Sequence, residues 1–328
     1  MKASIIIRAY NEERRLEECL LAVFAQQTSF PFEVIIVHTE SMDGTLSIAK
    51  RFPTKIVHIK KEDFTPGKGS NIGCMNASGD YFVFLSGHSI PASAYWLETL
   101  VRNFESPNIA GVYGKQIPFP GCYPWEVRLL TEEWPMKRQS QIDNPFFSLV
   151  NAAIRKERWN EVNFNEGGTI TDDQEWARDM QRCGYGILYD PEVAVYHSHN
   201  TGMMGACERF SKEIHGLYLV HGEHIFLRLF SDIRRAAIRD ILFIRAHRYS
   251  ARWIGRSLLR NTLLFVVLLY MTVSTPYGRQ WLMFTLDRFA NPLRFVYRLS
   301  AFLRRRSETY GLFVDRIKRA YQEPSSLT

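Results

Sequence analysis

The fold is decided by the stretch Tyr81-Phe82-Val83-Phe84-Leu85-Ser86-Gly87-His88-Ser89-Ile90-Pro91. Its apolar first half predicts a buried strand, and the strand ends on polar residues. In an open α/β sheet, ligands bind at the carboxyl ends of the strands. We therefore expect Ser86 and His88 to lie at a ligand site.

Short apolar runs alternate with amphipathic stretches over the first third of the chain. The expected strands are 4–8, 32–38, 55–60, 81–86 and 109–116, and the expected helices are 14–26, 43–52, 67–77 and 94–104. This alternation predicts a mostly parallel sheet with helices on both faces. Further on, residues 173–183 predict a helix, 186–190 and 193–197 predict strands, and the proline-rich segment 118–144 predicts an irregular connection.

Composition excludes several classes of protein. The chain has 328 residues, of which 46% are hydrophobic and 23% charged, so it is not a disordered protein. Its five cysteines form no CxxC pair, which argues against a disulfide framework and against a thiolate zinc site. The first residues show no signal-peptide pattern. These observations predict a protein of the cytoplasm.

Charge divides the chain into two regions. Residues 1–225 carry 22 Lys and Arg against 28 Asp and Glu, whereas residues 226–328 carry 19 against 6, and 18 of those 19 cations are arginine. Arginine suits contact with phosphate groups. We expect a catalytic domain at residues 1–207 and a helical, basic appendage at residues 208–328 that meets an anionic partner.

The appendage contains the most apolar run of the chain, Leu263–Val273, and no charge lies between Arg260 and Arg279. A spanning helix needs about 20 apolar residues, and Pro276 and Gly278 shorten this one. The flanking arginines favour a helix that lies in the headgroup region of a membrane. A membrane span and a core helix for residues 261–278 both stay open.

Three groups of residues are candidates for chemistry. Asp172 and Asp173 precede the helix expected at 173–183, where they suit either an acidic first turn or a catalytic role. His197 and His199 alternate on an expected strand and so point to opposite faces, which makes one of them structural. His88 comes from another strand tip and could converge with His197 on a metal ion.

A glycine-rich segment, Gly67–Gly73, opens an expected helix. Its amides and Lys68 could face a diphosphate, although it is neither a Walker loop nor a dinucleotide fingerprint. A flexible turn is the alternative.

The ordered motifs resemble those of family 2 glycosyltransferases, and most closely the rhamnosyltransferase-like members of cell-surface polysaccharide pathways. The segments that carry the resemblance, over roughly residues 3–200, are 4–13, 33–45, 67–71, 77–80, 86–91 and 171–176. The resemblance implies a GT-A fold, which is a mostly parallel sheet flanked by helices, together with an inverting mechanism and a nucleotide-sugar donor.

The resemblance also implies roles for individual residues. Asp173 matches the catalytic base, with Asp172 beside it, and His197 matches a position from which some members add a metal ligand. The remaining positions that match the donor and nucleotide pocket are Ala9, Tyr10, Glu12, Glu40, Gly67, Lys68, Asn71, Ser86 and Gly87.

The chain departs from the family's usual pattern at two places. The Asp-x-Asp metal motif is here Ser86-Gly87-His88, and the acidic residue after the second strand is replaced around His38-Thr39-Glu40. Imidazole favours borderline ions over hard Mg²⁺. We therefore expect a divalent metal with Mn²⁺ favoured over Mg²⁺, held by His88 and His197.

Together these features predict an inverting glycosyltransferase, peripheral on the inner face of the cell membrane. Its expected acceptor is a glycan or a polyprenyl-diphosphate-linked precursor, and its basic region is expected to meet an anionic membrane surface. A catalytically silent scaffold that binds nucleotide-sugars is the alternative. A nucleic-acid partner is not expected, because the run Leu263–Val273 between the arginines favours lipid.

Overall fold

The computed structural model describes residues 1–132, 134–141, 146–167, 171–199, 202–221 and 224–274. The chain divides into two compact units, Met1–Phe265 and Val266–Thr328. All the strands and the predicted site residues belong to the first unit.

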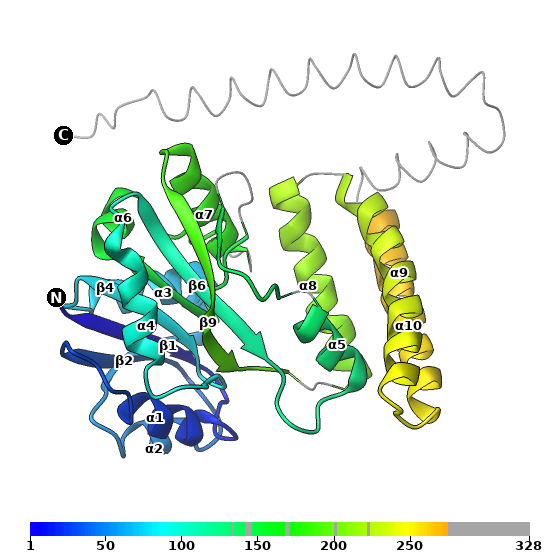
Figure 1. Cartoon of the computed structure of the whole chain (residues 1–328), viewed down its shortest axis with the longest axis horizontal. Coiled ribbons are helices and arrows are strands. Elements are labelled where there is room, and N and C mark those ends of the chain that lie inside the picture. Colours follow the sequence, from blue (N-terminus) through cyan, green and yellow to red (C-terminus); the bar gives the residue numbers. More distant parts are fainter. Residues whose placement is uncertain (133, 142–145, 168–170, 200–201, 222–223, 275–328) are drawn as a thin grey trace, which may run out of the picture. The chain divides into compact units, whose positions relative to one another are not determined.

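The first unit is built on one mixed sheet (Figure 1). Its nine strands are β1 (Ala3–Ala9), β2 (Phe32–Thr39), β3 (Lys55–Ile59), β4 (Tyr81–Ser86), β5 (Ile90–Pro91), β6 (Ile109–Ile117), β7 (Gln139–Gln141), β8 (Asn151–Arg155) and β9 (Gly186–Tyr196). The strand order is β3-β2-β1-β4-β8-β6-β9-β5, and β7 pairs with β9. The predicted α/β fold is confirmed.

Helices cover both faces of the sheet. The described helices are α1 (Leu16–Phe24), α2 (Thr45–Ala49), α3 (Pro66–Met75), α4 (Trp96–Arg102), α5 (Pro124–Glu132), α6 (Lys156–Glu161), α7 (Asp172–Arg182), α8 (Met203–His221), α9 (His224–Ala246) and α10 (Arg252–Ser274), with short 3-10 turns at Lys61–Asp63 and Asn103–Glu105. Side chains of α1, α2 and α4 share one buried cluster with alternate strand residues, and those of α3 and α7 share the other. This period-two division explains why the central strands are apolar throughout.

The strand order reverses at β1: β2 and β3 follow on one side of it, and β4 is added on the other side. Strand β1 pairs in parallel with β2 on one side and with β4 on the other. Parallel neighbours end at the same edge of the sheet, and a crevice forms where the strand order reverses. The residues that follow β1 and β4 therefore meet there.

Strand β9 reaches the same edge through an irregularity. Its pairing with β6 jumps from Gly114–Asp190 to Lys115–Ala194. The backbone of β9 passes so close to Gly114 that a Cβ there would lie 1.8 Å from the carbonyl oxygen of Val193. This bulge directs the end of β9 toward the crevice.

Two predicted elements differ in the structure. The segment 118–144 was expected to be irregular, but it contains α5, which begins at Pro124, a residue that suits the first turn of a helix. The strands expected at 186–190 and 193–197 are one bulged strand, β9, that ends at Tyr196. Both differences arise because local sequence does not reveal the partner that stabilises each element.

The predicted domain boundary after residue 207 falls inside α8, which runs without a break from Met203 to His221. The compact units instead divide after Phe265. A division of labour between residues 1–207 and 208–328 stays a prediction about function.

Helix α10 carries the apolar run of the sequence. By length and composition, Arg252–Tyr270 is the one candidate for a membrane span among the described residues, and 22% of the tested window is buried. The exposed part therefore includes apolar side chains such as Leu259 and Phe265.

We expect Gly114→Ala to destabilise the protein by about 1–3 kcal/mol, because the new methyl group overlaps the backbone of β9. Urea unfolding measures the change. Gly255→Ala is the control: its added Cβ meets no atom within 4 Å outside its own helix, α10, and we expect it to stabilise the protein by up to about 1 kcal/mol. Equal stability of the two variants would show that the bulge is not needed.

Candidate active site

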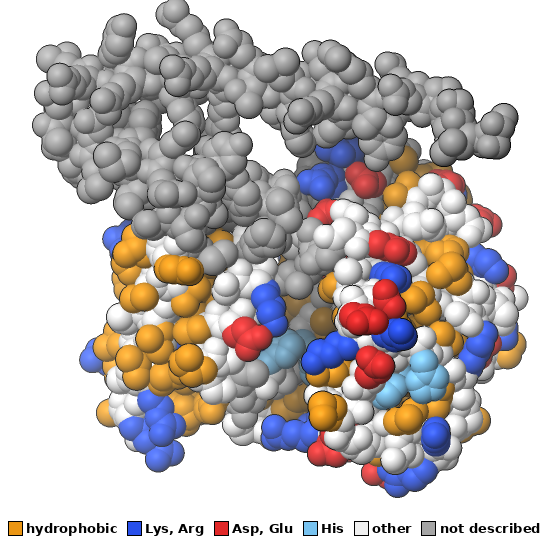
Figure 2. Space-filling model, turned by 180° about the vertical axis from the view of Figure 1, so that it is seen from behind, with side chains coloured by type: hydrophobic (Ala, Val, Ile, Leu, Met, Phe, Trp, Pro, Cys, Tyr) orange, Lys and Arg blue, Asp and Glu red, His pale blue; other side chains and the backbone are white. Residues whose placement is uncertain are grey.

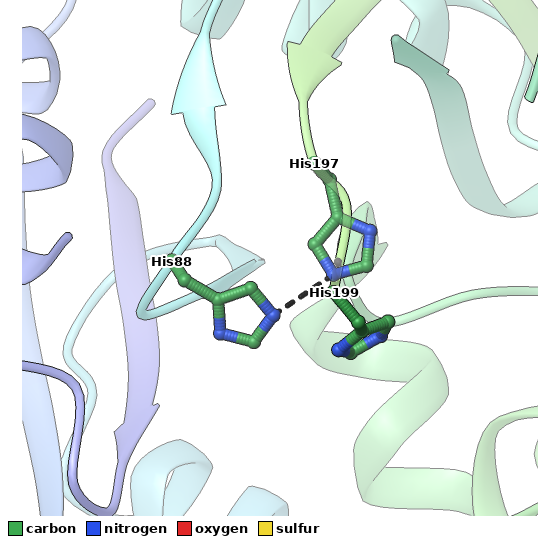
Figure 3. Close-up of side chains that lie close together, drawn as sticks. All are labelled: His88, His197 and His199. Atoms are coloured by element: carbon green, nitrogen blue, oxygen red, sulfur yellow. Dashed lines mark hydrogen bonds between the residues drawn. The ribbon is translucent and has the colours of Figure 1, made fainter. Parts of the chain in front are cut away.

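Three histidines meet at the sheet edge. His88 follows β4, and His197 and His199 follow β9; one ligand nitrogen from each lies within 4.8 Å of those of the other two (Figure 3). The Nε2 atoms of His88 and His197 are 3.0 Å apart. His88 is partly buried, His197 is buried and His199 is exposed, so the cluster opens to solvent on one side.

The prediction that His197 and His199 point to opposite faces is wrong. It assumed a regular strand, but β9 ends at Tyr196. The next residues are held one by one: the amide of His197 donates to Ile117 (2.8 Å), Ser198 Oγ accepts from the amide of Phe119 (3.4 Å), and the amide of His199 donates to Glu126 Oε1 (2.7 Å). These bonds turn both imidazoles toward His88.

Polar neighbours fix the orientation of two of the rings. Nδ1 of His197 lies 2.7 Å from Gln116 Oε1, and Nδ1 of His88 lies 2.9 Å from Glu12 Oε1. Because an amide oxygen and a carboxylate accept hydrogen bonds, both Nδ1 atoms donate, and the Nε2 atoms face each other. Two lone pairs at 3.0 Å repel unless a cation, either a proton or a metal ion, lies between them. The donor set therefore suits a metal ion.

The environment keeps two of the imidazoles neutral. Burial lowers the pKa of His197 well below its usual value, with further contributions from the charges of His88, His199 and Arg209. His199 is exposed as a residue, but its ring packs against those of His88 and His197, and this desolvation, followed by the charge of Arg209, lowers its pKa to about 3. Neutral imidazole is the metal-binding form, so these rings can bind a cation without first releasing a proton.

The acidic pair opens α7. Asp172 is buried, and its carboxylate lies 3.9 Å from Arg8 Nη1. Arg8 also donates to the carbonyl of Pro66 (2.8 Å) and to Ser70 Oγ (3.2 Å), both on α3. Asp172 therefore joins the helix of the acidic pair to β1 and α3.

Asp173, unlike Asp172, forms no ion pair with a described residue, although its carboxylate accepts two backbone hydrogen bonds. Its Oδ2 accepts a hydrogen bond from the amide of Leu149 (3.2 Å), and its Oδ1 accepts one from Gln174 (2.8 Å). Desolvation, and then the charge of Asp172, raise the pKa of Asp173 to about 7. Burial likewise raises the pKa of Asp172. A carboxylate with a pKa near neutrality is suited to accept a proton.

The glycine-rich segment forms the first turns of α3. Thr65 caps the helix by accepting from the amide of Lys68 (3.1 Å), and the Lys68 ammonium lies 3.7 Å from Asp63. A Cβ at Gly67 would lie 2.0 Å from the carbonyl oxygen of Asn165, so only glycine fits. This close approach of two backbone segments is enough to explain the glycine at position 67, and no bound ligand is needed for the explanation.

Asn71 has a structural task. Its amide group bonds to both the amide and the carbonyl of Phe164, to Trp159 Nε1 and to Glu166 Oε1. These bonds hold the segment before α7 against α3. A contact between Asn71 and a donor stays a prediction.

The other predicted donor residues lie near the ends of β1, β2 and β4. Tyr10 is exposed, and its hydroxyl lies 2.7 Å from Lys61 Nζ. Glu40 accepts from the amide of Lys61 (2.8 Å) and lines a surface cavity with Lys60, Lys61 and Glu62. This cavity lies beside the ends of β2 and β3.

Ala9, Ser86 and Gly87 complete the predicted set. Ala9 is buried at the end of β1, and Ser86 Oγ lies 3.2 Å from His88 Nδ1. A Cβ at Gly87 would lie 3.0 Å from Cγ of Glu12. A side chain at position 87 would therefore crowd Glu12, and glycine leaves room for the contact between Glu12 and His88.

Gln116 and Arg8 are not among the predicted site residues: Gln116 orients His197, and Arg8 pairs with Asp172. Glu12, which was predicted for the donor pocket, contacts His88, and His199 joins the cluster although it was expected to point away from His197. The spacing His-x-His just after a strand is the one sequence signal for His199. Figure 2, seen from the side opposite to Figure 1, shows one group of histidine side chains in a hollow near the middle of the molecule and another on its open surface.

Two family models match the chain. "Glycosyl transferase family 2" matches residues 4–164, and "Glycosyl transferase family group 2" matches residues 89–299. The second covers more than half of the chain and includes the acidic pair, His197 and His199, whereas His88 lies within the range of the first.

Individual proteins are also similar. The chain is 29% identical over 231 residues to the O-antigen chain rhamnosyltransferase RfbN of Salmonella typhimurium, covering 63% of this chain and 73% of that protein. It is 28% identical over 227 residues to the O-antigen chain rhamnosyltransferase WbaN of Salmonella anatum, covering 62% and 72%. Among solved structures, the mannosyltransferase PcManGT from Pyrobaculum calidifontis, in complex with GDP-Man and Mn²⁺, superposes with a TM-score of 0.52 at 16% identity and covers 90% of this chain and 87% of that one. The structural likeness shows a shared GT-A fold.

We expect Asp173→Asn to stabilise the protein at pH 8 but to have little effect near pH 4. The folded-state pKa of about 7 lies above the usual value of 3.8, so the ionised carboxylate opposes folding increasingly as the pH rises from about 4 to 7. The gain is on the order of 1–3 kcal/mol once a lost backbone hydrogen bond is allowed for. Thermal unfolding in chelator at both pH values measures it.

The control is Asp179→Asn on the same helix, whose carboxylate forms an exposed pair with Arg182 at 3.2 Å. Its effect should be small at both pH values. A stability change in Asp173→Asn that does not depend on pH would contradict the raised pKa.

Proposed function

This chain belongs to glycosyltransferase family 2, and we propose that it is an inverting enzyme that transfers a sugar from a nucleotide-sugar donor to an acceptor hydroxyl. The observation that carries this proposal is Asp173, a carboxylate with a pKa of about 7 at the start of α7. Asp173 takes the proton of the acceptor hydroxyl as that oxygen attacks the anomeric carbon, and the sugar's bond to the diphosphate breaks.

Desolvation of a partly buried carboxylate is what makes Asp173 an effective base. An ordinary aspartate has a pKa near 3.8 and is too weak to accept a hydroxyl proton. Desolvation and the charge of Asp172 raise its proton affinity, while the pairing of Asp172 with Arg8 keeps the acidic pair in place. Asp172 is therefore a positioning residue.

The residues around the ends of β1 and β4 bind the nucleotide-sugar donor. The nucleotide-sugar binds along Ala9, Tyr10 and Glu40 and the start of α3, and Lys61 adds a positive charge beside Tyr10. When bound, a divalent cation would neutralise charge on the leaving diphosphate, and His88, His197 and His199 would hold it. An all-imidazole set favours Mn²⁺ over Mg²⁺.

We further propose that the acceptor is a precursor of a cell-surface polysaccharide, carried on a lipid, and that the enzyme acts at the inner face of the cell membrane. The similarity to two O-antigen chain rhamnosyltransferases supports the polysaccharide. The C-terminal helices support the membrane: Figure 2 shows hydrophobic side chains gathered on that side of the molecule. Exposed members of this surface in α9 and α10 are Ile238, Leu242, Leu258, Leu259 and Phe265.

We expect Asp173→Asn to lower the release of nucleotide at least a hundredfold while its donor affinity stays within threefold, because the amide cannot accept the proton. A screen of UDP-, GDP-, dTDP- and CMP-sugars with wild-type protein first identifies the donor. In the wild type, kcat/KM should fall tenfold per pH unit below about pH 7 as Asp173 becomes protonated.

Asp179→Asn serves as control, since Asp179 lies on the same helix but on its exposed surface. Equal turnover by Asp173→Asn and wild type would remove Asp173 from the mechanism. Donor binding without turnover in the wild type, with acceptor extracts present, would favour the silent scaffold.

We expect His88→Ala and His199→Ala to weaken Mn²⁺ binding at least tenfold in calorimetry. Glu12→Gln should weaken it by about tenfold, because it orients a ligand without being one. His247→Ala is the control, since this exposed histidine follows the end of α9 and lies outside the cluster. Unchanged affinity in His88→Ala would exclude the histidines as the metal site.

A further inference from the structure

A second polar cluster lies beside the histidines and has no part in the chemistry above. It joins α5, α9 and α10 around Asp240, which is fully buried. Asp240 accepts hydrogen bonds from Arg128 Nε (2.6 Å), Ser257 Oγ (2.6 Å) and Asn261 Nδ2 (3.1 Å). These three bonds use both carboxylate oxygens.

Arg260 belongs to this cluster but is left without a partner. Its side chain is only 9% exposed, and its Nε has no hydrogen-bond partner among the described residues. No ion pair within 4 Å joins it to a described carboxylate, and its guanidinium carbon lies 5.8 Å from the centre of the Trp125 ring. Nη2 of Arg128 is also buried and unpartnered.

An unpaired buried guanidinium is costly for a fold. Burial lowers the pKa of Arg260; the charges of Asp240 and Glu126 oppose this shift, and those of Arg209 and Arg128 add to it. Asp240 makes its direct bond to Arg128, which also pairs with Glu132. The buried Nε of Arg260 and Nη2 of Arg128 are therefore two hydrogen-bond donors without a partner among the described residues, and an anion would satisfy them.

The cluster adjoins the proposed active site through consecutive residues of α5. Trp125 lies under the Arg260 guanidinium, and the next residue, Glu126, accepts from the amide of His199 at 2.7 Å. The anion site is therefore next to the histidines, on the side away from β1, β2 and β3, where the donor residues lie.

We propose that Arg260, supported by Arg128, binds a phosphate group of the acceptor and so holds a lipid-linked acceptor beside the reacting centre. The inference rests on the proposed function, and it names the chemical class of the acceptor. Arginine binds phosphate through paired N–H groups. The same helix presents Leu258, Leu259 and Phe265 to the outside, which offers an apolar surface for the lipid attached to that phosphate.

The same phosphate chemistry has two possible sources, the donor and the acceptor, and calorimetry on the full chain separates them. Farnesyl diphosphate, inorganic pyrophosphate and farnesol are titrated with and without saturating amounts of the nucleoside diphosphate of the identified donor, or of UDP and GDP if no donor turns over. We expect farnesyl diphosphate to bind in the presence of the nucleotide, more tightly than pyrophosphate and at least tenfold more tightly than farnesol.

Variants test the residue. Arg260→Gln should weaken farnesyl diphosphate binding at least tenfold and leave nucleotide affinity within twofold, and Arg260→Lys should fall between that variant and wild type. The matched control is Arg256→Gln, which removes the same charge one turn earlier from an exposed position over Trp253 and should have no effect.

Three results would overturn the proposal: displacement of farnesyl diphosphate by the nucleotide, equal weakening in Arg256→Gln and Arg260→Gln, or farnesol binding as tightly as the diphosphate. Because the first and third use wild-type protein, they decide the question even if Arg260→Gln does not fold. Absence of donor turnover, with farnesyl diphosphate binding that depends on Arg260, would count against the proposed transferase activity and not against this site.

Discussion

The parallel pairing of β1 with both β2 and β4 is the constraint on which the site depends. Because each of these strands runs in the same direction, their ends meet at one edge, and Glu12 after β1 faces His88 after β4 at 2.9 Å. The bulge in β9 then directs His197 to the same point, and single hydrogen bonds hold the following residues there. The acidic pair is tied to this edge through Arg8, which is itself a β1 residue. Each functional group thus takes its position from the central strands.

The sequence predicts the central half of the sheet well, because β1, β2 and β4 are apolar on both faces and carry a strong local signal. It does not reveal β5, β7 or β8, which are short and depend on partners far along the chain; Asn151–Arg155, for example, is a strand because it lies antiparallel to both β4 and β6. For the site, sequence indicates His88 and His197. It misplaces His199, because strand alternation no longer applies once β9 has ended at Tyr196.

Net charge was a poor guide to where the arginines act. The excess of arginine after residue 225 suggests a solvated surface that meets an anionic partner, and Arg252 and Arg256 are indeed exposed. Arg260 lies on the same helix yet is buried beside Asn261 and the Asp240 carboxylate. Whether an arginine of α10 faces solvent or the protein interior depends on how α10 packs against α5 and α9. That orientation decides whether its charge serves solubility or binds a ligand. Composition does not contain that information.

The histidine cluster suits a cation and Arg260 suits an anion, and consecutive residues of α5 link the two: Trp125 lies beside Arg260, and Glu126 bonds to His199. Desolvation first, and then neighbouring positive charge that includes Arg209, lowers the pKa of His197 and His199, which keeps them in the form that binds a cation. A cation at the histidines would in turn repel the arginines unless an anion lay between them. Phosphate groups supply such an anion, and Coulomb attraction at this range strengthens where water is excluded. If both proposals hold, cation and phosphate binding are coupled, and by linkage each raises the affinity of the other.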